Sequence, residues 1–477
     1  MISTHPLNEI LQPASIAVVG VSDKPTSQGQ RFIRPLLELG FKGNIYPVNP
    51  KLSEILGIKV YPSLREIPGS IDYVISCVPA SEVLNILEDC PQKGVKGIHL
   101  FTARFSETGR PEATDLEQKI LKKVRENGIR LIGPNCMGFH DTRQGISWWD
   151  DCPKKPGSVG IAFQSSMAAQ DLANLASLRG IRFSKIIGYG NALDLNESDF
   201  LDYLSQDPET ELILMYVEGV KDGKRFFTAL REAASSKPVI ILKGGRGKAG
   251  ARAAASHTAS LTGSTEIWET LVTQAGAISA QDPDELMDIA VSFYYLPQIT
   301  GKRVGIAGGS GGPSVLAADQ CEEAGLDVIP LPTEIRNELK SQGNSIWDWI
   351  GNPADMSLTA FTAGSDFNPG DVLIMMDKNQ YFDLLIAIMG APRIRGQQVT
   401  PVDTHLERYK ISEINQKPLL GVVIDKSLDI NAYNDPTCQL TAEMRTKLIA
   451  ANIPVYPTVG RAAKAVNKLI TYYQRRK

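Results

Sequence analysis

Short apolar runs alternate with segments of helical periodicity along this chain, and this alternation constrains the fold more than any other feature. The first five runs are "ASIAVVG", "NIYPVNP", "YVISCVP", "GIHLFTA" and "IRLIGPN", and helical segments such as "TDLEQKILKKVRENG" lie between them. Strands that alternate with helices favour a parallel sheet with right-handed crossovers. We therefore predict a Rossmann-like α/β domain over residues 1–147.

The same alternation restarts twice further along the chain. One restart carries the runs "SVGIAFQSS", "FSKIIGYGN", "ELILMYVEG" and "KPVIILKGG", and the other carries "KRVGIAGGSGG", "YFDLLIAIM" and "PLLGVVID". A chain of 477 residues is also long enough for about three domains of roughly 150 residues each. We predict a second α/β domain over 150–297 and a third over 298–477.

Composition excludes several classes of protein. The net charge is −3 without long blocks of one sign, which argues against a nucleic-acid surface. No run approaches the roughly 20 apolar residues of a membrane span, and the first residues lack a signal-peptide core. The 6 cysteines are scattered without metal-ligand spacing, so we expect no metal site and a cytoplasmic protein.

The ends of the first four predicted strands are rich in small and turn-forming residues: Gly20, the Val48-Asn49-Pro50 turn, Val78-Pro79 and Phe101-Thr102-Ala103. Ligands of parallel α/β sheets bind at the carboxyl ends of the strands, where helix N-termini favour phosphate groups. These residues therefore predict a nucleotide-like ligand, although turn chemistry alone also explains them. A full GxGxxG motif does not follow the first strand, which weakens a dinucleotide interpretation.

His257 lies in the small-residue stretch "GARAAASHTASLTGS", which we expect to be a loop. A buried structural histidine would have periodic apolar neighbours, and a metal ligand would have partners, but neither pattern is present. An imidazole among small residues suits a general base or a nucleophile that carries a phosphoryl group. An ordinary flexible loop is the remaining alternative.

Three further features would suit a phosphorylated histidine. Gln164-Ser165-Ser166 ends one strand and opens a helix, so its amides and hydroxyls can hold an anion. "NPADMSLTA", with Ser357 and Thr359, is a candidate for a second helix start, and the glycine-rich "GGSGGPS" is interpreted first as a tight turn. Glu218 follows the run "LILMYV", where it can orient an imidazole or simply be a surface carboxylate.

Together these motifs resemble the nucleoside-diphosphate-forming acyl-CoA synthetases, the ADP-forming acetyl-CoA synthetase type, which is related to succinyl-CoA synthetase. The resemblance covers essentially the whole chain and rests on "IAVVGVS", "GFKGNIYPVNPK", "LIGPNCMG", "KPVIILKGGR", "GARAAASHTASLTGS" and "GGPSVLAADQCEEAG". It implies the α subunit of such an enzyme: a Rossmann-like CoA-binding domain followed by two flavodoxin-like domains.

The resemblance also implies roles for the candidate residues. His257 would be phosphorylated transiently with Glu218 as its partner, and an ATP-grasp β subunit would hold ATP or ADP with Mg²⁺. Phosphate-binding positions would be Gln164, Ser165, Ser166, Ser357 and Thr359. CoA would be bound by Gly20, Val21, Ser22, Asn49, Pro50, Lys51, Val78, Pro79 and Thr102, with Asn135 and Cys136 towards its thiol.

The chain departs from the family pattern at several positions. Arg104 and Ser166 stand where the family usually has glycine, Ala259 and Thr262 replace a usual glycine and alanine, and no ATP-grasp segment follows the third predicted domain. We therefore expect either a ligase α subunit that needs a partner or a CoA-binding or acyl-CoA-binding paralogue without ligase activity. A nicotinamide-dependent dehydrogenase is a weaker alternative, because the second strand lacks a terminal acidic residue.

Overall fold

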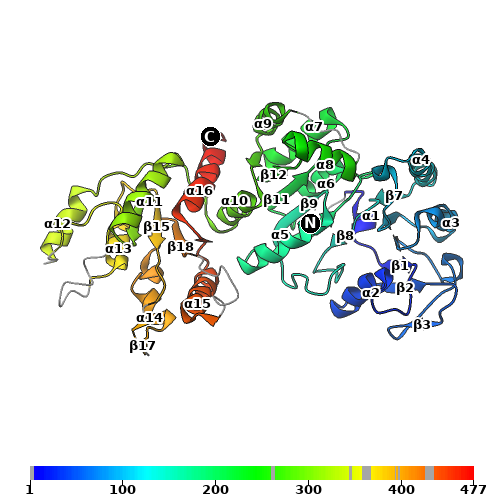
Figure 1. The fold of residues 1–477 in the computed structure, drawn as a ribbon, viewed down its shortest axis with the longest axis horizontal. Helices are drawn as coiled ribbons and strands as arrows, with labels where there is room; N and C mark the ends of the chain where they lie inside the picture. The colour runs from blue at the N-terminus through cyan, green and yellow to red at the C-terminus, as the bar shows by residue number, and fades with distance from the viewer. Residues whose placement is uncertain are drawn as a thin grey trace. The chain divides into compact units, whose positions relative to one another are not determined.

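The computed structural model describes residues 5–258, 264–342, 346–356, 367–392, 394–395, 398–424 and 434–476, with the backbone alone for 255–258, 395 and 398. The chain divides into two compact units, Met1–Leu286 and Met287–Lys477. This division falls within helix α10 (Pro283–Tyr295), so the predicted domain boundaries at 147–150 and 297–298 stay predictions. Figure 1 follows the chain from blue to red through both units.

A five-stranded parallel sheet forms the first part of unit one, as the sequence predicts (Figure 1). Its buried strands are short and apolar, and Ala17 pairs with Tyr46 on one side and Val74 on the other. Strands buried on both faces are typical of a parallel sheet covered by helices. In sheet order the strands are β2 (Asn44–Val48), β1 (Ser15–Val19), β5 (Tyr73–Ser76), β6 (Gly97–Leu100) and β7 (Arg130–Ile132).

The connections of this sheet contain helices and short turns. The α-helices are α1 (Asn8–Leu11), α2 (Gln28–Glu38), α3 (Val83–Asp89) and α4 (Pro111–Glu126). The short 3₁₀ turns are η1 (Leu64–Glu66), η2 (Ala80–Glu82), η3 (Pro91–Lys93) and η4 (Ser106–Thr108), and a small hairpin pairs β3 (Glu54–Ile55) with β4 (Ile58–Lys59). Pro111 at the start of α4 lacks only an N–H that the helix would not use there.

A six-stranded sheet completes unit one. Its order is β13 (Ile278–Ala280), β12 (Val239–Lys243), β11 (Leu212–Val217), β9 (Pro156–Phe163), β10 (Phe183–Gly188) and β8 (Gly138–His140). The four central strands were predicted; β8 and β13, of 3 residues each, were not. Strand β8 is antiparallel to β10, so the chain passes from the last strand of the first sheet directly into the edge of the second.

Helices follow the strands of the second sheet and begin at clear capping residues. The side chain of Ser165 accepts a hydrogen bond from the Ala168 N–H, and Asn196 and Asp199 form a reciprocal capping box. Such caps satisfy N–H groups that a helix start leaves without partners. The helices are α5 (Ser166–Leu178), α6 (Glu197–Gln206), α7 (Gly223–Ser236), α8 (Lys248–Thr258) and α9 (Thr265–Gln274).

Unit two contains a third parallel sheet, in the order β14 (Val304–Gly308), β15 (Leu384–Ile388), β18 (Leu419–Val422) and β19 (Val455–Tyr456). The first three strands were predicted, and β19 was not. A small hairpin pairs β16 (Ile394–Arg395) with β17 (Gln398–Val399). The remaining elements are α10 (Pro283–Tyr295), α11 (Gly311–Glu323), α12 (Thr333–Ser341), α13 (Pro369–Lys378), α14 (Val402–Glu407), η6 (Ile411–Glu413), α15 (Pro436–Ala450) and α16 (Val459–Gln474).

Candidate active site

The carboxyl edge of the first sheet gathers the predicted CoA-binding residues. Gly20 adopts φ 91°, and a Cβ there would lie 3.0 Å from the backbone carbon of Cys77, so the turn after β1 favours glycine. Asn49 Nδ2 donates to the Val21 carbonyl at 2.6 Å, and its Oδ1 accepts from the Lys51 N–H at 2.7 Å. The bond to Val21 ties the end of β1 to the end of β2, and the bond from Lys51 closes the turn after β2.

A hollow of about 430 Å³ lies at the start of α2, which follows the β1 turn. Ser27 caps this helix by accepting from the Gln30 N–H at 3.3 Å. Helix N-terminal amides and two guanidinium groups suit a ligand that carries phosphate groups, so the residues present fit the phosphates of a nucleotide. The hollow is lined by Pro25, Thr26, Ser27, Gln28, Arg31, Arg34, Trp149 and Asp150.

The segment after β7 carries Asn135 and Cys136. The Asn135 N–H donates to the Thr102 carbonyl at 2.9 Å, and Thr102 Oγ1 donates to the Val78 carbonyl at 2.5 Å, so the ends of β5, β6 and β7 are joined. Cys136 is buried, and burial raises the pKa of its thiol to about 12. A thiol with that pKa stays protonated near neutral pH, so Cys136 is a packing residue rather than a nucleophile.

Backbone strain is concentrated beside Asn135. Among the described residues, 6 non-glycine residues have a positive φ, and 3 of them, Arg104 (81°), Asn135 (57°) and Ala192 (55°), lie in adjoining loops. The Asn191 N–H donates to the Pro134 carbonyl at 3.0 Å. A left-handed backbone costs a non-glycine residue about 1–2 kcal/mol, and such strain is typical of functional sites.

Glu107 holds these loops together. Its carboxylate accepts hydrogen bonds from the Arg104 N–H, from the Phe105 N–H at 3.0 Å and from Asn191 Nδ2 at 2.8 Å. The loop after β6 in the first sheet is therefore fixed to the loop after β10 in the second sheet. The carboxyl edges of the two sheets meet at this point.

The predicted phosphate-binding residues Gln164, Ser165 and Ser166 lie at the start of α5, and their side chains already have partners. Gln164 Oε1 accepts from the N–H groups of Glu218 and Gly219 at 2.8 and 3.2 Å. Ser166 Oγ accepts from the Met137 N–H at 3.0 Å, and Ser165 caps the helix. The backbone amides of the first turn are the groups that can face an anion here.

Glu218 is buried at the end of β11, rather than lying on the surface. Lys243, which ends the adjacent β12, donates from Nζ to the Glu218 carbonyl at 2.6 Å and to the Gly244 carbonyl at 2.5 Å. Burial lowers the pKa of Lys243, and the Glu218 carboxylate opposes that shift. Burial and the same carboxylate raise the pKa of Tyr216 to about 12. Lys243 was not predicted, although a lysine that ends an otherwise apolar strand is a visible signal.

We expected His257 to lie in a loop, and this prediction is wrong for its backbone. Helix α8 extends as far as Thr258 and includes His257. The reason is composition: residues 251–255 include four alanines, and alanine is the strongest helix former. Helix α8 packs against η4 of the first sheet's β6 loop. The His257 side chain, together with Ala259 and Thr262, lies outside the described residues.

Ser357 and Thr359 also lie outside the described residues, and 351–356 before them are not helical. Unit two has a different helix start at the end of β14, where Gly308 and Gly309 have φ 97° and 82°. Ser310 then precedes α11 as its N-cap residue without a side-chain capping bond. The "GGSGGPS" motif is therefore a tight turn, as predicted, and it also opens a helix.

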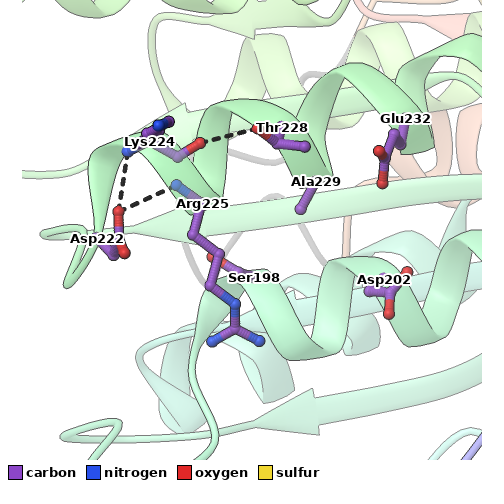
Figure 2. Close-up of a pocket in the computed structure, with 8 residues that line it drawn as sticks. All are labelled: Ser198, Asp202, Asp222, Lys224, Arg225, Thr228, Ala229 and Glu232. Carbon is purple, nitrogen blue, oxygen red and sulfur yellow. Dashed lines mark hydrogen bonds between the residues drawn. The ribbon is translucent and has the colours of Figure 1, made fainter.

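A second hollow in unit one, of about 390 Å³, lies between α6 and α7 (Figure 2). Asp222 accepts from the N–H groups of Lys224 and Arg225, both at 3.0 Å, and Arg225 pairs with Asp199 at 2.6 Å. The Arg225 charge at this hollow is therefore paired within the protein. The predicted site residues are not among those that line it, which are Ser198, Asp202, Asp222, Lys224, Arg225, Thr228, Ala229 and Glu232.

Two further searches were restricted to the described part of the chain. None of its groups of His, Cys, Asp and Glu side chains is arranged to hold a metal ion. None of its helices has both the length and the apolar character needed to cross a bilayer.

Comparison with known proteins decides the family. Residues 14–142 match a CoA binding domain and residues 156–293 match a succinyl-CoA ligase like flavodoxin domain. The chain is 36% identical to the α subunit of ADP-forming acetate–CoA ligase II of Pyrococcus furiosus, over 90% of this chain and 93% of that one. The chain belongs to the family of ADP-forming acyl-CoA ligases.

Two other relatives of this acyl-CoA ligase are informative. An ADP-forming acetate–CoA ligase of Methanocaldococcus jannaschii is 38% identical over 74% of this chain, but that match covers 49% of the longer relative. An acetyl-coenzyme A synthetase of Ca. Korarchaeum cryptofilum, solved with phosphate and ADP, superposes with a TM-score of 0.81 at 29% identity, over 98% of this chain and 97% of that chain. The predicted α-subunit resemblance and fold class are thus confirmed.

Proposed function

We propose that this chain is the α subunit of an ADP-forming acyl-CoA ligase. With an ATP-grasp β subunit it converts a carboxylic acid, CoA and ATP reversibly into acyl-CoA, ADP and phosphate, and His257 carries the phosphoryl group. The observation that supports this most directly is the near-complete match to an α subunit. The meeting of both carboxyl edges beside α8, whose last turn contains His257, supports it further.

CoA binds as a substrate along the first sheet. The turn at Gly20, Val21 and Ser22 and the start of α2 meet its phosphates, and Asn49, Pro50 and Lys51 border the same ligand. Val78, Pro79 and Thr102 continue this edge towards Asn135 and Cys136 at the thiol end. The interstrand bonds of Asn49 and Thr102 keep the edge fixed before the ligand arrives, which reduces the ordering cost of binding.

The chemistry of His257 follows from the overall reaction. Its imidazole nitrogen takes the phosphoryl group of ATP, so a P–N bond forms and ADP leaves. The carboxylate of the acid then takes this group, with a P–O bond formed and the P–N bond broken, which gives an acyl phosphate. The CoA thiol attacks the acyl carbon, loses its proton and displaces inorganic phosphate. Each step is reversible.

Glu218 orients the imidazole and raises its basicity, as a carboxylate does for other reactive histidines. Lys243 holds the strand end on which Glu218 lies. The first amides of α5, behind Gln164, Ser165 and Ser166, stabilise the phosphoryl dianion. Ser357 and Thr359 remain candidates for a second contact with this dianion.

The nucleotide is assigned to a partner subunit. The longer M. jannaschii relative is about twice the matched length, and the P. furiosus relative is named as one subunit. We assign ATP, ADP and Mg²⁺ to a separate ATP-grasp β subunit in a hetero-oligomer. The 6 cysteines are all free thiols, which supports a reducing, cytoplasmic location.

The test is transfer of phosphate from γ-labelled ATP to this chain in the presence of a β subunit. We expect acid-labile label on His257, its loss in His257→Asn, and its release when CoA and an acid are added. CoA binding should be unchanged in His257→Asn. Binding of CoA without label, in pairings with several β subunits, would contradict the proposal and favour a CoA-binding paralogue.

A further inference from the structure

Arg104 lies in a loop that adjoins Asn135. It follows β6, next to β7 in the sheet, and the Glu107 carboxylate ties it to the Asn191 loop. The Asn135 N–H bonds the Thr102 carbonyl two residues before Arg104. Under the proposed function, Asn135 borders the thiol of CoA, so the atoms beyond that thiol face the Arg104 loop.

The Arg104 guanidinium is available to a ligand. The residue is exposed, and no ion pair to it is present in the part of the chain that the structure describes. The Glu107 carboxylate in the same loop accepts from the N–H groups of Arg104 and Phe105 and from Asn191. With φ 81°, the position would suit glycine better, so a structural role does not account for arginine here.

The other anions of the reaction have donors elsewhere. The phosphates of CoA are assigned to the ends of β1 and β2, and β5 lies between β1 and the β6 edge that carries Arg104. The transferred phosphoryl group is assigned to the amides of α5. The acyl group is the substrate part that has not been given a donor, and the exposed Arg104 lies in the loop that borders it.

We propose that Arg104 selects acids that carry a second carboxylate, which its guanidinium binds at the far end of the acyl chain. A planar guanidinium matches a carboxylate with two parallel hydrogen bonds. The inference rests on the proposed function for the position of the thiol. It names the substrate class as dicarboxylic acids, in place of plain acetate.

Binding of acyl-CoA thioesters to the full chain tests this without turnover. Succinyl-CoA and butyryl-CoA both carry a four-carbon acyl group, and they differ in the terminal carboxylate. By calorimetry we expect the wild type to bind succinyl-CoA about 10-fold more tightly, as expected for a charge-assisted bond. Arg104→Gln should bring the ratio of the two dissociation constants close to 1, and Arg104→Lys should keep part of it.

Arg231→Gln is the matched control, because Arg231 is an exposed arginine on α7, and its ratio should equal that of the wild type. A wild-type ratio close to 1, a ratio that survives in Arg104→Gln, or binding of neither thioester would overturn the proposal. An effect of Arg104→Gln on His257 labelling without any change in the ratio would do so too, because Arg104 would then serve the phosphoryl group. If only the phosphate labelling of His257 fails, the proposed ligase function is contradicted, but the preference for succinyl-CoA over butyryl-CoA is not.

Discussion

The carboxyl edges of the second and third sheets are built in different ways. At the second sheet, the side chains of Gln164, Glu218 and Lys243 are buried. Gln164 Oε1 accepts from the Glu218 N–H, and Lys243 Nζ donates to the Glu218 carbonyl, so neighbouring strand ends are joined. At the third sheet, the corresponding turn after β14 is an exposed run of glycine and serine, and Gly312 would have open space around an added Cβ. The edge of the second sheet supplies fixed side chains, whereas the edge of the third sheet supplies mainly backbone groups.

Under the proposed function, this difference corresponds to two ways of handling a phosphoryl group. Fixed, buried charges can tune a reacting imidazole, because they keep their orientation in a region of low dielectric. Exposed backbone amides at a helix start can hold an anion whatever side chains surround them. We expect chemistry to depend on side chains in unit one and on backbone conformation in unit two.

The largest expected effect comes from Glu218→Gln. The substitution keeps the shape of the buried side chain but removes its charge, so under the proposed function the imidazole loses the group that raises its basicity. We expect the rate of phosphate transfer to His257 to fall about a thousandfold, within the range for a lost acid–base partner. Quench-flow measurement of labelled protein, with a β subunit and γ-labelled ATP, provides the rate.

Two controls sharpen that result. Glu211→Gln changes an exposed carboxylate immediately before the same strand and should leave the rate unchanged. Ser310→Ala at the third sheet should cost less than about threefold, because the Ser310 side chain makes no capping bond and the backbone remains. Equal losses from Glu218→Gln and Ser310→Ala would break the comparison between the two edges.

The three parallel sheets, and the residues at the carboxyl ends of their main strands, could be predicted from the sequence because both follow from local periodicity. The prediction missed β8, β13 and β19, whose two or three residues show no period of their own. It found β7, which also has three residues, because that strand lies in the longer apolar run "IRLIGPN". The prediction of a loop around His257 was also wrong, because it gave the glycines and serines of this segment more weight than its alanines. In that case the helix propensity was visible in the sequence.

The contacts between strand ends could not be predicted in the same way. The bonds that Asn191 donates to Glu107 and that the Glu218 N–H donates to Gln164 join residues 84 and 54 positions apart. The pairing of Lys243 with the Glu218 carbonyl depends on which strands are neighbours in the sheet. The positive φ of Arg104 arises from this packing, although the resemblance to a family with glycine there pointed to it.

A pair of glycine substitutions tests the same contrast in stability. Gly190 has φ 61°, and a Cβ there would lie 2.3 Å from the Pro134 carbonyl oxygen. Gly190→Ala should destabilise unit one by about 3 kcal/mol through overpacking and backbone strain. Gly312→Ala, in the first turn of α11, should leave unit two as stable or up to about 1 kcal/mol more stable.

Tryptophan fluorescence during urea unfolding separates the two units. Trp148, Trp149 and Trp268 report on unit one when Trp347 and Trp349 of unit two are replaced by phenylalanine, and the reverse replacement reports on unit two. Equal destabilisation by the two alanine substitutions would contradict the difference in packing at the two edges.

The third effect, smaller than those of Glu218→Gln and Gly190→Ala, concerns His140, which is fully buried in β8 with Nε2 3.0 Å from Thr142 Oγ1. Burial lowers the pKa of His140 to about 4 from its ordinary value of 6.5. Below pH 6.5 the His140 imidazole binds a proton in the unfolded chain, whereas in the folded chain it stays neutral until about pH 4. The free energy of unfolding of unit one therefore falls as the pH is lowered through this window.

His140→Phe removes this contribution while keeping a ring beside Trp149. From pH 6.5 to 4.5, unit one of the variant should lose about 2 kcal/mol less of its unfolding free energy than the wild type. Burial raises the pKa of the nearby Asp141 carboxyl, which works in the opposite direction, so the difference between variant and wild type is the quantity to measure. The pH dependence of unit two should be the same in both proteins, because His140 belongs to unit one; a parallel change in both units would mean that the two edges are not independently stabilised.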